Sequence, residues 1–378
     1  MQCEVEFFDS QNEGISGRAK AGCVRPRTLA RQASYPGSIF GQTAETITCF
    51  PLYELSPFER LLVTAKGDLQ RIISSWCDEV VTVQVNYYDL AKKTQTEDYY
   101  SRKVELKCRG KRFCIATSEI ILSSKELKDA LATKEVGIGQ LFRRFSLCPQ
   151  FTLSEVTRDH RHNLFSRKYC LKSDGIVCNI VEDFDAEQIC SLEKIVIGEV
   201  LQQLDPKSEK DELLCVPLRY SSTEFSPFER VLLSAYDNVP RLVSSYLNEN
   251  VEMTVSHSQR TTSNGFLRIA NLLVSGKPFC VAKCEFTVVD EGLNLLLESG
   301  KFSLNDIFTK YKGGRLPKFK LESALKIKKQ NSLPIDSAWL TMPIPKNSLY
   351  RKYTLATSFA IAHVQELFEP WIVEIACK

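Results

Sequence analysis

The sequence lacks the features that would place the chain in a membrane or outside the cell. It has no run of about 18 apolar residues that could span a bilayer, and it does not open with a charged-then-apolar signal peptide. The net charge is only +3, so the whole chain has no strong field that would attract a polyanion. We therefore expect a cytoplasmic protein with no membrane partner and no nucleic-acid partner.

Signatures of bound metals and cofactors are also missing. The fourteen cysteines show no CxxC pair and no repeated spacing; the closest group is a CxxxC formed by Cys280 and Cys284. This scatter predicts buried thiols rather than a disulfide framework or a metal site. No glycine-rich loop of the phosphate-cradling type is present, and no helix-turn-helix pattern occurs. We expect no metal and no cofactor.

What the sequence does contain is an internal repeat. The pentapeptide Ser-Pro-Phe-Glu-Arg begins at Ser56 and again at Ser226, and 10 of the 21 positions that follow from each start are identical. Three further motifs recur in the same order: Gly-Lys-x-Phe-Cys, an aliphatic residue before Phe, and Arg-Lys-Tyr. Two copies of one domain in tandem are therefore predicted.

The repeat fixes the expected domain boundaries. Residues 1–45 are rich in Gly, Ser, Ala and Arg and predict a flexible tail. Repeat 1 is assigned to residues 46–205 and repeat 2 to residues 211–378, separated by the polar stretch 205–212. The two repeats are expected to pair within the chain as a pseudo-dimer.

Local patterns predict an α+β fold for each copy. Ser56, Pro57 and Glu59 form the start signal of a helix with a capping box. An apolar stripe then continues to Trp76, with a break expected at Gly67. The remaining segments mainly predict strands, at 80–87, 100–108, 112–121 and 169–184. This order indicates an antiparallel sheet with helices gathered elsewhere.

Strand alternation places four charged residues on faces that are otherwise apolar. Arg102 shares a face with Val104 and Leu106. By the same count Glu182, Arg268 and Glu366 also point inward. A buried charge must be paired or must serve a ligand. Two readings stay open: internal Arg–Glu ion pairs that close the core, or pockets in which the arginine binds an anionic oxygen and the glutamate moves a proton.

In both copies the order Ser-Pro-Phe-Glu-Arg, Arg-x-x-x-Leu, Gly-Lys-x-Phe and Arg-x-Tyr ends in a strand that carries the glutamate. This order resembles the chorismate lyase-like superfamily, and it covers most of residues 50–190 and 220–372. The resemblance implies two tandem domains, each an antiparallel sheet with helices and helical flaps on one side. It also implies a cofactor-free lyase that expels pyruvate from chorismate and leaves 4-hydroxybenzoate.

The same resemblance assigns roles to residues of this chain. It implies that Glu182 and Glu366 are catalytic and that Arg102 and Arg268 bind the ligand carboxylate. Further ligand-binding positions implied by the resemblance are Ile138, Leu304, Leu69 and Val239.

The second copy departs from the pattern in two ways. Gly139 of repeat 1 is replaced by Asn305, and an insertion between Phe308 and Glu366 includes the lysine-rich stretch 310–329, which is expected to be solvated. The sequence as a whole predicts binding of a small aromatic carboxylate or enol-pyruvyl compound, with lyase activity better supported in repeat 1. The alternatives are a non-catalytic ligand sensor and a protein-interaction scaffold that retains the fold.

Overall fold

The opening helices of both repeats begin where the capping boxes predict. The Ser56 side chain caps α2 (Pro57–Val63) by accepting from the Glu59 amide at 3.2 Å, and Glu59 Oε2 accepts from the Ser56 amide at 2.8 Å. Ser226 and Glu229 form the same two bonds at the start of α7 (Pro227–Ser234). Because both copies satisfy the first amides of the helix in the same way, the repeat in sequence is also a repeat in structure.

The structure is a computed structural model that describes residues 52–132, 138–145, 147–199, 225–235, 239–298, 307–308, 317–327 and 344–375. All of these residues belong to one compact unit, Pro36–Lys378. The predicted tail 1–45 and the predicted linker at 205–212 lie outside the described residues, so they stay predictions.

A second helix follows each opening helix. In repeat 1 it is α3 (Leu69–Cys77), and the break before it falls at Gly67, whose φ of +80° favours glycine. In repeat 2 it is α8 (Val239–Leu247). The apolar stripe predicted from Phe58 to Trp76 is buried throughout. The helix pair therefore forms as its 3.6-residue periodicity predicts.

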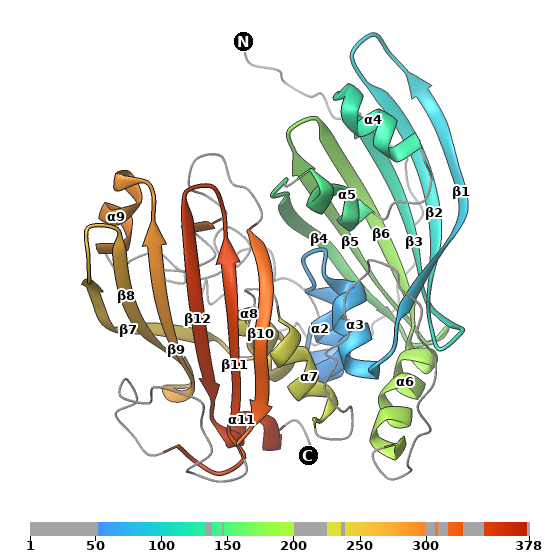
Figure 1. The fold of residues 1–378 in the computed structure, drawn as a ribbon. Helices are drawn as coiled ribbons and strands as arrows, with labels where there is room; N and C mark the ends of the chain where they lie inside the picture. Colours follow the sequence, from blue (N-terminus) through green and yellow to red (C-terminus); the bar gives the residue numbers. More distant parts are fainter. Residues whose placement is uncertain are drawn as a thin grey trace, which may run out of the picture. The chain divides into compact units, whose positions relative to one another are not determined.

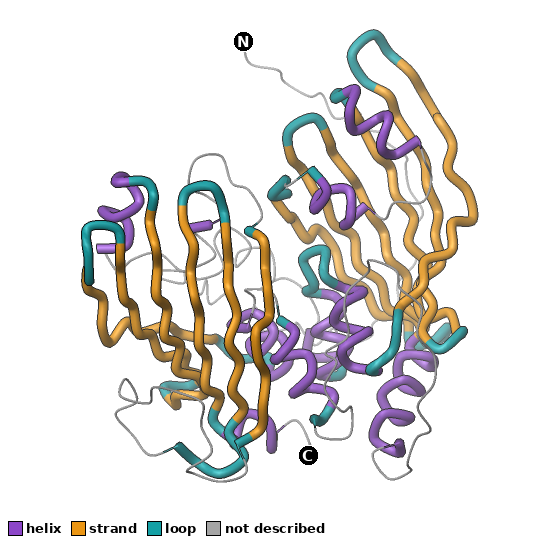
Figure 2. Tube along the Cα trace, in the orientation of Figure 1, coloured by secondary structure: helices purple, strands orange, loops and turns teal. Residues whose placement is uncertain are grey.

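Each repeat builds one six-stranded antiparallel sheet (Figures 1 and 2). The strands of repeat 1 are β1 (Val81–Lys93), β2 (Asp98–Cys108), β3 (Lys111–Leu122), β4 (Gln150–Asp159), β5 (Leu164–Ser173) and β6 (Ile176–Asp185). Those of repeat 2 are β7 (Val251–Arg260), β8 (Gly265–Val274), β9 (Lys277–Val288), β10 (Lys318–Lys326), β11 (Leu349–Ala356) and β12 (Ala360–Phe368). The orders β1-β2-β3-β6-β5-β4 and β7-β8-β9-β12-β11-β10 match strand for strand. Two tandem α+β domains are confirmed.

The remaining helices of the described residues lie before, between or after the strands. They are η1 (Leu52–Glu54), α4 (Lys125–Ala132), α5 (Ile138–Arg144), α6 (Ala186–Glu199), α9 (Glu291–Glu298) and α11 (Pro370–Glu374). α4 packs on β3, α6 packs on β3 and β6, and α9 packs on β7 and β9. Alternate residues of β2 and β8 are buried.

Two predictions about the strands were wrong. The segment 169–184, predicted as one strand, contains the end of β5 and most of β6, which turn at Gly175 with a φ of +75°. The stretch 310–329, expected to be a solvated insertion, contains β10, which pairs with β11 as β4 pairs with β5. Its lysines alternate with apolar residues because β10 is an edge strand with one face on the core.

The helices of the two repeats share one hydrophobic core. Residues of α2, α3, α7 and α8 belong to a single buried cluster. Phe58 stacks on Trp76 with ring centroids 4.1 Å apart, and Phe228 stacks on Tyr246 at 4.2 Å. Trp76 and Tyr246, which occupy equivalent positions, lie 6.4 Å apart. Each copy thus stacks its own phenylalanine on one ring of the Trp76–Tyr246 pair.

Candidate functional site

The four charged residues selected by strand alternation are all buried. The exposed fraction of each is between 2% and 5% (Arg102, Glu182, Arg268 and Glu366). Their inward orientation is therefore confirmed. Their partners, however, divide them into two kinds of site.

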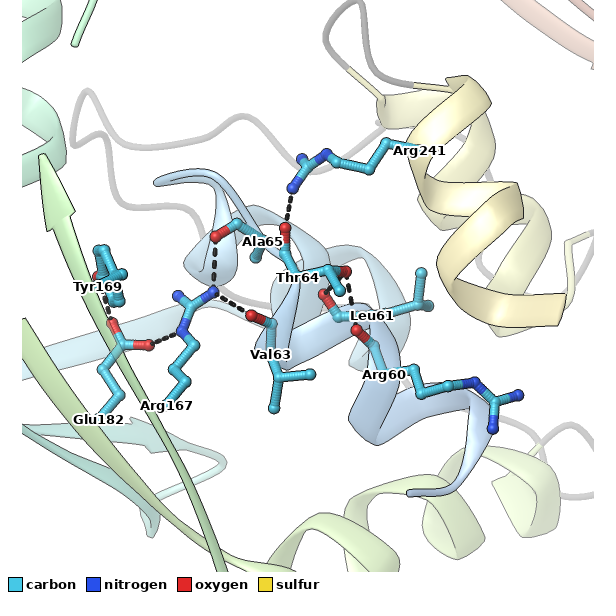
Figure 3. Close-up of polar contacts among 9 residues, drawn as sticks. All are labelled: Arg60, Leu61, Val63, Thr64, Ala65, Arg167, Tyr169, Glu182 and Arg241. Carbon is cyan, nitrogen blue, oxygen red and sulfur yellow. Dashed lines mark hydrogen bonds and ion pairs between the residues drawn. The ribbon is translucent and has the colours of Figure 1, made fainter. Parts of the chain in front are cut away.

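The first site surrounds Glu182, on β6 (Figure 3). Arg167 lies directly opposite it on β5 and donates from Nε to Glu182 Oε2 at 2.7 Å. The Tyr169 hydroxyl donates to Glu182 Oε1 at 2.8 Å. Both carboxylate oxygens of Glu182 therefore accept a hydrogen bond from the neighbouring strand. We call Arg167, Tyr169 and Glu182 the repeat 1 triad.

Arg167 connects the repeat 1 triad to the end of the first helix. Its Nη1 donates to the backbone oxygens of Val63 at 3.2 Å and of Ala65 at 2.6 Å (Figure 3). These carbonyls lie at and just beyond the end of α2, where no intrahelical amide remains to bond them. A cation placed there also complements the negative end of the helix dipole.

Repeat 2 forms the same triad. Arg351 donates from Nε to Glu366 Oε2 at 2.6 Å, and the Tyr353 hydroxyl donates to Glu366 Oε1 at 2.9 Å. Arg351 Nη1 donates to the backbone oxygens of Leu232 at 2.9 Å and of Ala235 at 2.5 Å, at the end of α7.

The electrostatics of both triads favour a fixed ion pair. Burial by itself would lower the pKa of Arg167 and of Arg351, but the adjacent glutamate offsets it and the pKa of each arginine is raised. Burial, reinforced by the same glutamates, raises the pKa of Tyr169 and Tyr353 well above the ordinary value, so both phenols stay protonated donors. Each glutamate is thus held by a cation and a neutral donor.

The Arg-x-Tyr motif was visible in the sequence of both repeats, but its role was missed. Alternation indicates which residues face inward, whereas the pairing of Arg167 with Glu182 depends on the register between β5 and β6. That register could not be derived while the two strands were taken as one segment.

The second site surrounds Arg102, on β2. This guanidinium donates no hydrogen bond and forms no ion pair with any residue that the structure describes, although only 4% of the residue is exposed. Its pKa is lowered, first by burial, which the nearby Tyr88 and Cys178 only partly oppose. The cross-strand neighbours of Arg102 are Tyr88 on β1 and Ser118 on β3. Arg102 is therefore a buried residue whose guanidinium has no acceptor among the described residues.

The equivalent Arg268 of repeat 2 has an acceptor. Its Nη2 donates to the backbone oxygen of Leu297 on α9 at 2.9 Å. Burial lowers the pKa of Arg268 as well, with a smaller opposing effect from Cys284. The two arginines are thus equally buried but differently bonded.

Three of the other predicted ligand-binding positions lie at helix starts. Leu69 and Val239 are the first residues of α3 and α8, and both are buried. Ile138 is the first residue of α5 and packs, half-buried, on the core. Leu304 lies outside the described residues. Gly139, next to Ile138, approaches protein backbone: a Cβ added there would lie 3.3 Å from the Gly67 oxygen.

A pair of reciprocal arginine contacts was not predicted. Arg60 of the first Ser-Pro-Phe-Glu-Arg motif donates from Nε to the Ser245 oxygen at 2.9 Å and from Nη2 to the Tyr246 oxygen at 2.6 Å, near the end of α8. Arg230 of the second motif donates to the Ser75 oxygen at 2.8 Å and to the Trp76 oxygen at 2.5 Å, near the end of α3. We call these contacts the arginine clamps. The sequence signal that could have indicated these contacts is the arginine that ends the pentapeptide in both copies.

Further hydrogen bonds also join residues of one copy to residues of the other. The Thr64 hydroxyl donates to Ser245 Oγ at 2.7 Å, and the equivalent pair, Ser75 and Ser234, lies 2.6 Å apart. Arg241 on α8 donates to the Thr64 backbone oxygen (Figure 3). The end of α2 is therefore bonded both by its own triad and by repeat 2.

Within the described part of the chain, no group of three or more His, Cys, Asp or Glu side chains could hold a metal ion. None of the described helices is long and apolar enough to cross a membrane. No model of a known protein family matches the chain, and no curated protein matches it either.

Proposed function

We propose that repeat 1 binds a small anionic aromatic or enol-pyruvyl compound through Arg102. The observation that carries this proposal is the buried Arg102 guanidinium, which has no acceptor among the described residues. Taking an arginine out of water without a partner costs several kcal/mol. A ligand carboxylate would recover that free energy through paired N–H···O bonds.

The triads favour binding over proton transfer. For Glu182 to act as an acid or base, it would have to release Arg167 or Tyr169, because both of its oxygens already accept hydrogen bonds. Loss of one contact would leave a buried charge or phenol unpaired. We therefore place ligand binding first. A cofactor-free pyruvate-lyase of the chorismate lyase-like type, giving 4-hydroxybenzoate, is the catalytic form of the same proposal.

Calorimetric titration of chorismate and of 4-hydroxybenzoate, with pyruvate release followed in parallel, separates these possibilities. We expect both compounds to bind the wild-type protein, and Arg102→Ala to weaken binding by about 2–5 kcal/mol. Arg112→Ala, which removes an exposed arginine from the start of β3, is the control and should leave affinity unchanged. Pyruvate release that requires Glu182 would establish the lyase; binding without release would establish a sensor. If neither compound binds, the proposal fails.

A second candidate function is a scaffold in which the paired repeats present surfaces to other proteins. The arginine clamps favour this candidate, because each binds backbone carbonyls of the other copy. Pairing of the repeats through the clamps would hold the two sheets as one unit without a ligand, as a scaffold requires.

We place the protein in the reducing cytoplasm. Six cysteines of the described part are buried thiols that form no disulfide. Alkylation of the protein in freshly lysed cells, with and without prior reduction, tests this placement. Equal labelling in both samples is the expected result, and labelling that requires prior reduction would contradict it.

A further inference from the structure

Repeat 2 shows how the position equivalent to Arg102 can be satisfied. Arg268 on β8 and Ser258 on β7 are cross-strand partners. Arg268 Nη2 and the Ser258 hydroxyl both donate to the Leu297 backbone oxygen, at 2.9 Å and 3.4 Å. Leu297, in the last turn of α9, is completely buried. A carbonyl oxygen of the protein itself thus occupies the point where the two donors converge.

Repeat 1 carries two donor side chains at the equivalent backbone positions. Tyr88 on β1 is the cross-strand partner of Arg102 on β2. The β1–β2 pair has a register shift between Val85 and Tyr87, and the β7–β8 pair has one at the matching point, between Val255 and His257. Tyr88 therefore occupies the position of Ser258. No described residue accepts a hydrogen bond from Arg102, and the enclosed Tyr88 hydroxyl, which lies beside the Tyr100 phenol, has no partner at hydrogen-bonding geometry.

The wall beside these donors is aromatic. The Tyr88 ring stacks on the Tyr100 ring with centroids 5.1 Å apart and planes 8° from parallel. In repeat 2 the position of Tyr100 is taken by Phe266 and that of Tyr88 by Ser258, so this phenol pair belongs to repeat 1 alone. Stacked rings next to a cationic donor suit a flat, anionic ligand.

We infer that a carboxylate oxygen of the ligand takes, in repeat 1, the place that the Leu297 carbonyl takes in repeat 2, bound jointly by Arg102 and Tyr88. Repeat 2 is consequently self-occupied, and the chain binds one ligand. This inference rests on the proposed function and adds the second donor and the stoichiometry.

The chemistry of the two donors requires an anionic acceptor. Burial is the largest cause that raises the pKa of Tyr88, followed by the adjacent Tyr100 phenol, so Tyr88 remains a neutral O–H donor near neutral pH. Arg102 adds a positive charge with forked N–H groups. A carboxylate supplies two oxygens and the compensating charge, whereas an uncharged amide would leave the guanidinium uncompensated.

The test is calorimetric titration of benzoate, 4-hydroxybenzoate and benzamide into the full-length protein and two variants. Tyr88→Phe removes only the hydroxyl and keeps the ring stack. Ser258→Ala is the matched control in repeat 2. We expect one benzoate site per chain and no binding of benzamide. Tyr88→Phe should weaken benzoate about ten- to a hundredfold, as loss of a hydrogen bond to a charged group does, while Ser258→Ala should change affinity less than twofold.

The outcomes separate this inference from the proposed function. Unchanged benzoate affinity in Tyr88→Phe, with an unchanged melting temperature, would overturn the joint binding by Arg102 and Tyr88. Two equivalent sites per chain would overturn the self-occupied repeat 2. Both results would leave anion binding by Arg102 standing. Absence of binding by both carboxylates in the wild type would instead refute the proposed function, and the inference with it.

Discussion

At the scale of single residues, the triads decide how the buried charges contribute to stability. Glu182→Gln keeps the size of the side chain but removes the charge that compensates Arg167. Because a buried charge is then left unpaired, we expect the free energy of unfolding to fall by about 3–5 kcal/mol. Urea denaturation measures this change.

The control for this prediction is Glu105→Gln on the outer face of β2. Glu105 forms ion pairs with Lys107 and Arg112, which are much more exposed than Arg167. Loss of such pairs is expected to cost less than about 1 kcal/mol. Equal effects of the two substitutions would contradict the structural role of the triad.

Asp68, just before α3, gives a pH dependence at the same scale. Burial alone would raise the pKa of Asp68, but Arg241 and then Arg71 outweigh it, so the pKa lies below its ordinary value. The folded state therefore prefers the carboxylate. The stabilisation is complete above the ordinary pKa of about 4 and is lost as the pH falls toward the lowered folded-state pKa.

We therefore expect Asp68→Asn to flatten the loss of stability between about pH 4 and pH 2. Thermal melts of the wild type and the variant over that range provide the measurement. The sequence has Asn238 at the equivalent position of repeat 2, so an amide is a natural replacement. If the melting temperatures of the two proteins fall equally with pH, the ion pair with Arg241 contributes nothing to stability.

The inward or outward orientation of a side chain can be predicted where the alternation of a single strand is sufficient evidence. Alternation along β2 placed Arg102 inside, because the opposite face carries Lys103 and Glu105. The partners of the buried charges needed the registers of two strands, or of a strand and a helix. Neither the Arg167–Glu182 pair nor the Arg268–Leu297 bond can be derived from one segment alone.

At the scale of elements, the arginine clamps bond the ends of α3 and α8. Arg230 donates to the Phe225 oxygen of its own repeat and to the Ser75 and Trp76 oxygens of the other. Arg230→Ala leaves these buried carbonyls without that donor, so we expect a loss of about 2–4 kcal/mol in the free energy of unfolding. Guanidinium chloride denaturation gives the value.

Arg230→Lys distinguishes the guanidinium from a simple positive charge. An ammonium group has no planar fork that reaches three carbonyls, so we expect lysine to recover less than half of the loss. The exposed Arg112→Ala serves as the control and should stay within about 0.5 kcal/mol of the wild type. Full recovery by lysine would show that only the charge matters.

Elements with strong local signals were predicted well. The capping boxes fixed the starts of α2 and α7, and the break before α3 falls at Gly67 as expected, with a φ of +80°. The sequence does not predict β4, and it predicts an insertion in place of β10, because edge strands carry polar residues on their open face.

At the scale of the whole molecule, one hydrophobic cluster joins helices of both repeats. We expect the wild type to unfold in a single transition, observed alike by far-UV circular dichroism and by tryptophan fluorescence. Trp76 reports on the centre of this cluster, where its ring lies beside that of Tyr246. In Arg60→Ala/Arg230→Ala, which removes both clamps, the two signals should separate. A double variant that keeps one coincident transition would show that the apolar core alone couples the repeats.

The central claim is that repeat 1 binds an anionic ligand at Arg102, and a crystal structure of the protein with 4-hydroxybenzoate tests it most directly. We expect the ligand carboxylate on the Arg102 guanidinium, within hydrogen-bonding distance of the Tyr88 hydroxyl, and no ligand at Arg268, where the Leu297 oxygen stays bound. A structure in which a protein carbonyl or carboxylate pairs with Arg102, and the ligand is absent or lies elsewhere, would contradict the account.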